Sequence, residues 1–121
     1  MGLLGYTTKI EAEQSAEEIK SKLLSHYVID LRCDLGDEMV FIEFSKCIGI
    51  NTKGEPASYK ITAKINPVFE LLKKQQWSGE ITIAISRSQA KRVAWRIVKR
   101  WIDTQLAFVE TGMLRFDEVF L

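Results

Sequence analysis

A run of basic side chains in the last third of the chain offers the clearest chemistry in the sequence. Between Arg87 and Arg100 there are six cations and no acid. Arg92, Arg96 and Arg100 follow at steps of four residues, where like charges on a helix repel by roughly 0.2–0.5 kcal/mol per pair. An external anion would relieve that repulsion, and a nucleic-acid backbone is its commonest source. The predicted phosphate-binding residues are Arg92, Arg96, Lys99 and Arg100, with Arg87 and Lys91 at the rim.

Two other interpretations of this basic face stay open. Asp103 can offset Lys99 and Arg100 within the same helix, but nothing within it offsets Arg92 or Arg96. Carboxylates elsewhere in the fold could pair with these arginines, or the face could simply be solvated. The candidate carboxylates are Glu17, Glu18, Asp30 and Asp34.

A second basic cluster, Lys73 and Lys74, precedes Trp77 in a loop-like setting. Tryptophan side chains can stack on bases, so an exposed Trp77 would extend the binding site. Trp101 is predicted to lie in the core, at the centre of the apolar arc of its helix. Trp95 lies near the edge of that arc, which favours the core but leaves a surface role open.

Catalysis and metal binding have little support in the sequence. His26 is the only histidine and belongs to no Ser, Cys or Asp triad pattern. Asp30, Asp34 and Glu43 could converge on a divalent ion, but they alternate with Arg32 as an ordinary exposed strand face would. No glycine motif that cradles phosphate and no Cys-x-x-Cys pair is present. We therefore expect no enzyme, no metal and no cofactor.

The basic run requires a long helix to position it. Ser86 can cap a helix that extends from Arg87 to Thr111 and ends before Gly112. At about 100° per residue its apolar side chains spread over roughly 220°. Such a wide arc predicts packing on more than one side.

The first half of the chain predicts a helix and a hairpin. Ser15 and Glu18 match a capping box that starts a helix, with an apolar stripe at Ile19, Leu23 and Tyr27. A two-residue period then predicts strands at residues 28–34 and 38–48, joined by a turn near Gly36.

The rest of the sheet follows from the same period. Residues 58–65 alternate most regularly and predict a third strand. Asn66 and Pro67 predict the start of a short helix over residues 68–76, with Leu71 and Leu72 buried. Residues 80–85 resemble a fourth strand, with a loop as the alternative, and residues 6–10 form a short strand or a lead-in.

Composition and charge limit the domain number and the class of protein. The 121 residues, 46% hydrophobic and 27% charged, suit one soluble domain spanning 1–121. Residues 1–60 carry seven basic and ten acidic side chains, and residues 61–121 carry ten and six. A turn near Gly36 would place Cys33 opposite about Val40 and far from Cys47, which argues against a disulfide. No membrane span, secretory leader or transit peptide is visible, so a cytoplasmic location is expected.

The segment from Ala90 to Leu121 resembles the C-terminal part of small uncharacterised proteins encoded by bacteriophages and integrated mobile elements. The shared parts are Ala94 to Lys99, Trp101, Gln105 to Ala107, Glu110, Gly112-Met113 and Glu118 to Leu121. The resemblance implies a phage or mobile-element accessory protein in a bacterial host cell. It supplies no catalytic residues.

Together these observations predict an α+β domain, in which an antiparallel meander of three or four strands packs against a long C-terminal helix, an N-terminal helix and a short connector helix. The leading hypothesis is a non-enzymatic protein that contacts DNA or RNA phosphates through the basic helix. The alternative is an anti-CRISPR or other anti-defence protein that binds a host or phage protein. A homodimer that buries the wide apolar arc is a third possibility.

Overall fold

The computed structural model describes residue 3 and residues 5–46, 57–80 and 85–120. It confirms the predicted α+β fold, a three-stranded antiparallel meander packed against helices. The elements in chain order are α1 (Ala12–Leu24), β1 (Ile29–Asp34), β2 (Met39–Lys46), β3 (Ala57–Lys64), α2 (Asn66–Trp77), α3 (Arg87–Glu110) and α4 (Phe116–Val119).

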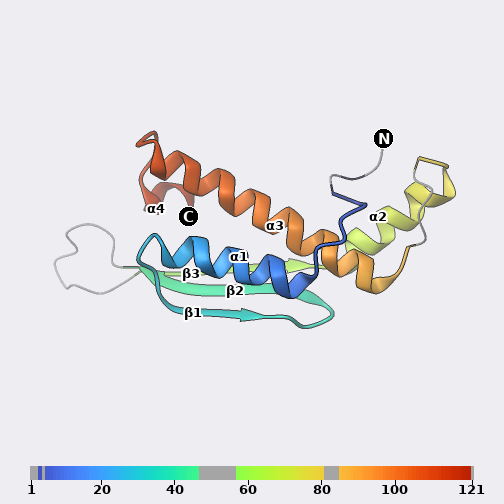
Figure 1. Ribbon diagram of the computed structural model, residues 1–121, viewed down its shortest axis with the longest axis horizontal. Helices are drawn as coiled ribbons and strands as arrows, with labels where there is room; N and C mark the ends of the chain where they lie inside the picture. Colours follow the sequence, from blue (N-terminus) through green and yellow to red (C-terminus); the bar gives the residue numbers. More distant parts are fainter. Residues whose placement is uncertain (1–2, 4, 47–56, 81–84, 121) are drawn as a thin grey trace.

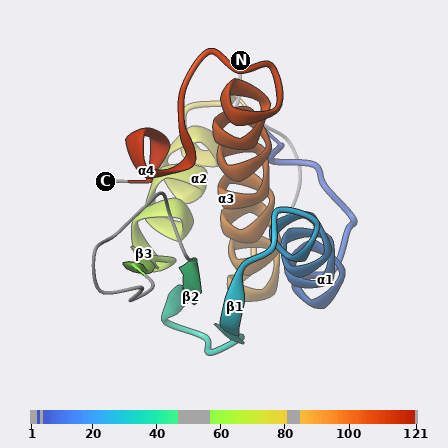
Figure 2. The same ribbon diagram turned by 90° about the vertical axis from the view of Figure 1, so that its left-hand side faces the viewer.

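The helices lie on one side of the sheet (Figures 1 and 2). α1 packs over β1, α3 crosses over β2, and α4 closes the end beside β3. α2 projects away from the sheet and contacts the first half of α3 (Figure 1). No described helix covers the other face of the sheet.

The central strand forms the floor of the core. Val40, Ile42 and Phe44 are fully buried beneath the helices, as their alternation predicts. Their neighbours Met39 and Phe41 point to the uncovered face and keep part of their surface in solvent. The sheet therefore has one apolar face and one face open to solvent.

The strand register differs from the prediction by two residues. Cys33 lies opposite Ile42, not Val40, because the turn is centred between Asp37 and Glu38 instead of near Gly36. Cys33 is a free thiol whose pKa is raised by burial. Cys47 lies outside the described residues.

The predicted start of α1 is wrong by one turn. The helix begins at Ala12 after an extended Glu11, and Ser15 lies inside it, fully buried. One buried stripe at helical spacing contains Ala12, Ser15, Ala16 and Ile19. Burial of this stripe extends the helix by one turn on the N-terminal side of Ser15. At the other end Tyr27 is 84% exposed with a positive φ of 63°, and so does not continue the stripe.

The predicted ends of the other helices are close to those observed. The Ser86 hydroxyl accepts a hydrogen bond from the Gln89 N–H at 3.1 Å, and Gly112 follows α3 with a φ of 80°. Both signals for α3 are confirmed. α2 begins with Asn66 inside the helix, not as its cap. Leu72 is buried as predicted, whereas Leu71 is 38% exposed.

Trp95 is buried, as the prediction favoured, whereas the predicted core position of Trp101 is wrong. Trp95 is fully buried and Trp101 is 42% exposed. The reason is that different sides of α3 are covered along its length. The first half packs against α2 through Leu72 and Val93, whereas the second half buries Ile102 and Leu106. Trp101 lies later in α3, where its ring packs edge-on against Phe120 and keeps part of its surface in solvent.

Two predicted segments form no strand that the structure describes. Residues 6 and 7 are part of a turn and residues 8–10 continue toward α1 without pairing in the sheet, so they are a lead-in. The possible fourth strand at residues 80–85 includes residues 81–84, which lie outside the described residues.

Candidate functional site

The two central arginines of the predicted phosphate-binding face are paired with carboxylates of the fold. Arg96 is 6% exposed, and its Nη2 lies 2.9 Å from Oε2 of Glu18 on α1. Arg92 Nη2 lies 3.0 Å from Oε1 of Glu11, just before α1, and its Nη1 donates to Gln89. The alternative interpretation, in which the fold's own carboxylates neutralise the arginines, holds for both residues.

The two lysines of the same helix also have partners. Lys91 Nζ donates to the Leu35 carbonyl at 2.7 Å and lies 3.2 Å from Asp37 Oδ1 in the β1–β2 turn. Lys99 pairs with Asp103 one turn later, as its spacing predicts. These ammonium groups hold the hairpin and the helix surface in place, so less of their charge is available to a ligand.

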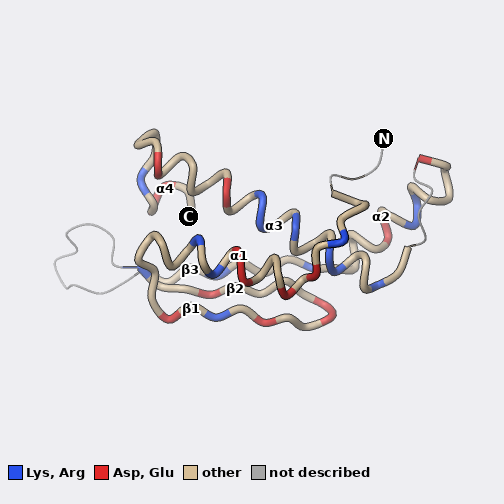
Figure 3. Tube along the Cα trace, in the orientation of Figure 1, with Lys and Arg blue, Asp and Glu red and all other residues tan. Residues whose placement is uncertain are grey.

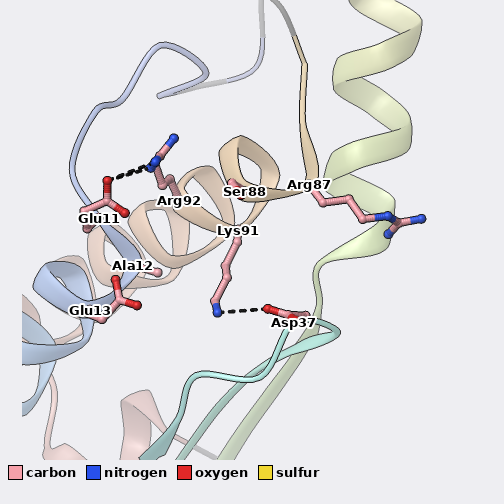
Figure 4. A pocket seen from close by; sticks show the side chains of 8 residues that line it. All are labelled: Glu11, Ala12, Glu13, Asp37, Arg87, Ser88, Lys91 and Arg92. Atoms are coloured by element: carbon pink, nitrogen blue, oxygen red, sulfur yellow. Dashed lines mark hydrogen bonds and ion pairs between the residues drawn. The ribbon is translucent and has the colours of Figure 1, made fainter.

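A cleft at the start of α3 collects several of these groups. Its volume is about 310 Å³, and Figure 4 shows the Arg92–Glu11 and Lys91–Asp37 pairs inside it. Its charged lining residues are Arg87, Lys91, Arg92, Glu11, Glu13 and Asp37. Because cations and carboxylates are equal in number, the cleft offers no excess positive charge to a phosphate.

Arg87 and Arg100 are the cations of α3 that have no carboxylate partner among the described residues. Arg100 is exposed, beside the N-terminal turn. Arg87 donates to the Asn66 side chain at 3.4 Å and lies over the Phe69 ring, 4.7 Å from its centroid. Both contacts leave the guanidinium charge uncompensated.

The aromatic and basic residues of α2 form the second part of the site. Phe69, Lys73 and Trp77 follow at steps of four residues and therefore share one side of the helix. Lys73 Nζ lies 5.1 Å from the centre of the Phe69 ring. Trp77 is 93% exposed, which is rare for an indole. We call Phe69, Lys73, Lys74, Trp77 and Arg87 the α2 patch.

The α2 patch carries an excess of positive charge. Lys73, Lys74 and Arg87 form no ion pair within the described ranges. Glu70 is the carboxylate inside α2, and Glu80 lies beyond its end, where it accepts from Ser78. Lys and Arg are spread along α3 and occur again on α2 (Figure 3). Of the unpaired cations of the predicted site, Lys73, Lys74 and Arg87 therefore lie on α2 and at the start of α3, and Arg100 lies farther along α3.

The only histidine belongs to an ion-pair network at the opposite end of the molecule. His26 Nε2 lies 3.0 Å from Glu110 Oε1, which also lies 2.8 Å from Lys22 Nζ. The hydrogen bond from Lys22, and then that from His26, lower the pKa of Glu110 below its ordinary value of 4.5. This network joins the ends of α1 and α3. Because Glu110 is far from Lys22 and His26 in the sequence, residue spacing did not predict the network.

The three acids considered for a divalent ion do not gather into a site. Glu43 lies opposite Arg32 across the β1–β2 ladder, and the two side chains form a 3.8 Å ion pair. Asp34 lies opposite Phe41 instead of a second carboxylate. Within the described part of the chain, no group of three or more His, Cys, Asp or Glu side chains is placed to hold a metal ion.

The open face of the sheet carries an aromatic contact that the sequence pattern did not predict. The guanidinium of Arg32 and the ammonium of Lys60 lie 4.9 Å and 5.4 Å from the centre of the Phe41 ring. Cross-strand register brings these residues together from three strands. Both cations contact the Phe41 ring, and Glu43 lies opposite each of them in the sheet. The positive charge of this face is therefore more fully compensated than that of the α2 patch.

Comparison of the chain with protein-family models, with curated proteins and with solved structures finds no match. The resemblance to phage and mobile-element proteins thus stays a prediction. Among the helices that the structure describes, none is both long and apolar enough to cross a bilayer.

Proposed function

We propose that the protein is a non-enzymatic nucleic-acid-binding protein whose phosphate contacts are made by the α2 patch. The observation that carries this proposal is the group of Lys73, Lys74 and Arg87 beside the exposed Trp77, without carboxylate partners in the described structure. Cations that the fold does not neutralise are the ones that an external polyanion can neutralise. Arg100 adds charge farther along α3.

The proposal assigns different work to the cations first expected at the centre of the site. Arg92, Arg96, Lys91 and Lys99 hold α3 to α1, to the β1–β2 turn and to its own next turn. Without these four cations, the proposed binding face is confined mainly to the end of the molecule that contains α2. A small footprint of this kind favours weak, sequence-independent binding, because phosphate contacts carry no base information.

Salt dependence tests this function directly. A fluorescently labelled oligonucleotide is titrated with the protein at low and at fourfold higher salt, once as DNA and once as RNA. Three phosphate contacts on a single strand predict that the affinity falls by roughly 20-fold over that change. The proposal fails if neither nucleic acid binds, or if the affinity does not change with salt.

Charge-matched variants locate the contact. Lys73→Gln with Lys74→Gln removes two cations of the α2 patch. Lys20→Gln with Lys60→Gln removes the same charge elsewhere, from a residue paired with Glu17 and one that contacts Phe41. We expect only the first pair to weaken binding by more than the small change due to net charge. Equal losses in both variants would show diffuse attraction without a site.

An anti-CRISPR or other anti-defence protein that binds a protein partner is the second candidate function. The exposed Trp77 favours it as well, because tryptophan is enriched among the residues that dominate protein interfaces. The apolar tail that follows α3 gives less support, since Phe116, Val119 and Phe120 are buried in the core. A pull-down from host lysate after nuclease treatment separates the two functions, because a partner bridged by nucleic acid is lost. The phage or mobile-element context and a homodimer are further proposals, and mass measurement in solution tests the dimer.

A further inference from the structure

We infer that Trp77 stacks on an unpaired base, so that the α2 patch selects single-stranded over double-stranded nucleic acid. This inference rests on the proposed function and specifies the form of its ligand. It follows from the position of the indole, from its rigid support and from the cations around it.

Trp77 has no use within the described fold. Its side chain is 93% exposed, and it makes no ring contact and no cation–π contact within residue 3 and residues 5–46, 57–80 and 85–120. By contrast Trp95 is fully buried and Trp101 packs edge-on against Phe120. An indole in water forgoes the stabilisation that burial of its large apolar surface would supply. A ligand that covers the ring recovers it.

The end of α2 holds the backbone of Trp77 in a fixed place. The N–H groups of Ser78 and Gly79 bond to the Lys74 and Gln76 carbonyls, and the Ser78 hydroxyl bonds to the Gln75 carbonyl. Gly79 has a φ of 83°, the left-handed conformation that ends a helix. The opposite side of α2 is packed on α3 through Leu72, which is fully buried. Because the backbone is already ordered, stacking on Trp77 does not require a loop to fold first.

The surrounding charges identify a nucleotide instead of a neutral aromatic ligand. Lys73 lies one turn before Trp77, about 5–6 Å away between Cβ atoms, and Lys74 is the next residue. Arg87 and Lys73 share the Phe69 ring, so the aromatic stripe has cations along its length. A flat apolar ring flanked by unpaired cations matches a base joined to its phosphates.

The preference for single-stranded over double-stranded nucleic acid follows from the accessibility of the base. A base inside a duplex has both faces covered by its neighbours, so an indole cannot stack on it without unstacking. An unpaired base presents its face freely, and stacking on one aromatic side chain strengthens binding by about 5-fold to about 150-fold.

The test compares three ligands of one sequence: single-stranded DNA, single-stranded RNA and the DNA duplex. Each is titrated with the unaltered protein and with Trp77→Phe, Trp77→Leu and Tyr27→Leu. Tyr27 is an exposed aromatic residue just after α1, whose C-terminal end lies far from α2 (Figure 1), and it serves as the matched control. Since Trp77 packs on nothing in the described fold, the thermal midpoints of the Trp77 variants should equal that of the unaltered protein.

We expect the single strands to bind more tightly than the duplex, and Trp77→Leu to lose at least about 5-fold on single strands only. Trp77→Phe should keep most of the affinity, and Tyr27→Leu all of it. Quenching of indole fluorescence on binding should disappear in Trp77→Phe. The DNA and RNA arms show which strand the protein prefers, and either preference fits the inference.

Two results overturn the inference while leaving the proposed function standing: equal affinity for strand and duplex, or equal losses on both in Trp77→Leu. In those cases Lys73→Gln with Lys74→Gln would still weaken binding. If that double variant has no effect, or if no nucleic acid binds, the proposed function itself fails.

Discussion

The guanidinium of Arg96 and the carboxylate of Glu18 lie 2.9 Å apart between α3 and α1. The geometry of this ion pair falls short of a hydrogen bond, so charge attraction is its main contribution. Arg96 is almost wholly removed from solvent, whereas Glu18 is partly exposed. A cation buried in this way stabilises the interface between two helices and cannot serve as a phosphate contact.

Replacing Glu18 should therefore destabilise the fold. Glu18→Ala leaves the Arg96 charge buried without its partner, at a cost of about 1–3 kcal/mol after allowance for the partial exposure of the carboxylate. Urea unfolding measures this change. The double variant Glu18→Leu with Arg96→Met should recover most of the loss, because it removes both charges. A Glu18→Ala variant as stable as the unaltered protein would contradict the structural role of the pair.

Ser15→Ala should stabilise the protein. The Ser15 hydroxyl is fully buried inside α1 and has no hydrogen-bond partner among the described residues. Alanine removes that unsatisfied group and is also the better helix former, for a gain of about 0.5–1.5 kcal/mol. If Ser15 capped the helix instead, the same substitution would cost about 1 kcal/mol. The sign of the change in the free energy of unfolding decides between them.

The two tryptophans of α3 should differ in their contribution to stability. Trp95→Ala removes a fully buried side chain and should cost about 3–5 kcal/mol. Trp101→Ala removes a half-exposed ring whose main aromatic contact is Phe120, and should cost about 1–2 kcal/mol. Chemical denaturation of both variants gives the comparison. The reverse order would place Trp101 in the core.

The Glu110 network should make stability fall at acid pH. The folded state lowers the pKa of Glu110, chiefly through Lys22, so the native state prefers the ionised carboxylate. A depressed carboxyl pKa adds stability above the unfolded value of 4.5, and that stability is lost as the pH falls through the folded value. We expect Glu110→Gln to reduce stability at pH 6 and to reduce it less near pH 3. An equal difference at both pH values would exclude this titration as the cause.

Local signals in the sequence predicted most elements of the fold, whereas contacts between residues far apart in the chain could not be predicted from it. Ser86 and Gly112 predicted the ends of α3 because caps act within one turn. Ser15 carried an equally good local signal, but burial of Ala12 in the core overrode it. Helix periodicity likewise identified an apolar arc on α3 but not which side of each half would be covered.

The candidate site could be predicted only in part, again because contacts between distant segments cannot be read from local patterns. Cations could be counted from the sequence, but their neutralisation by Glu11, Glu18 and Asp37 depends on how α1 and the β1–β2 turn pack against α3. Lys73, Lys74 and Trp77 were predicted in a loop-like setting, whereas all three lie in α2. Only the packing of α2 against α3 showed which side of that helix stays in solvent.

The slope of log affinity against log salt concentration tests most directly where the protein contacts phosphates. On a single strand each lost contact reduces the slope by roughly 0.7. Lys73→Gln with Lys74→Gln should therefore lower it by about 1.4, while Arg92→Gln with Lys99→Gln, which removes two cations already paired on α3, should leave it unchanged. If the α3 variant lowers the slope and the α2 variant does not, the phosphates contact the paired face of α3, and the α2 patch is not the binding site.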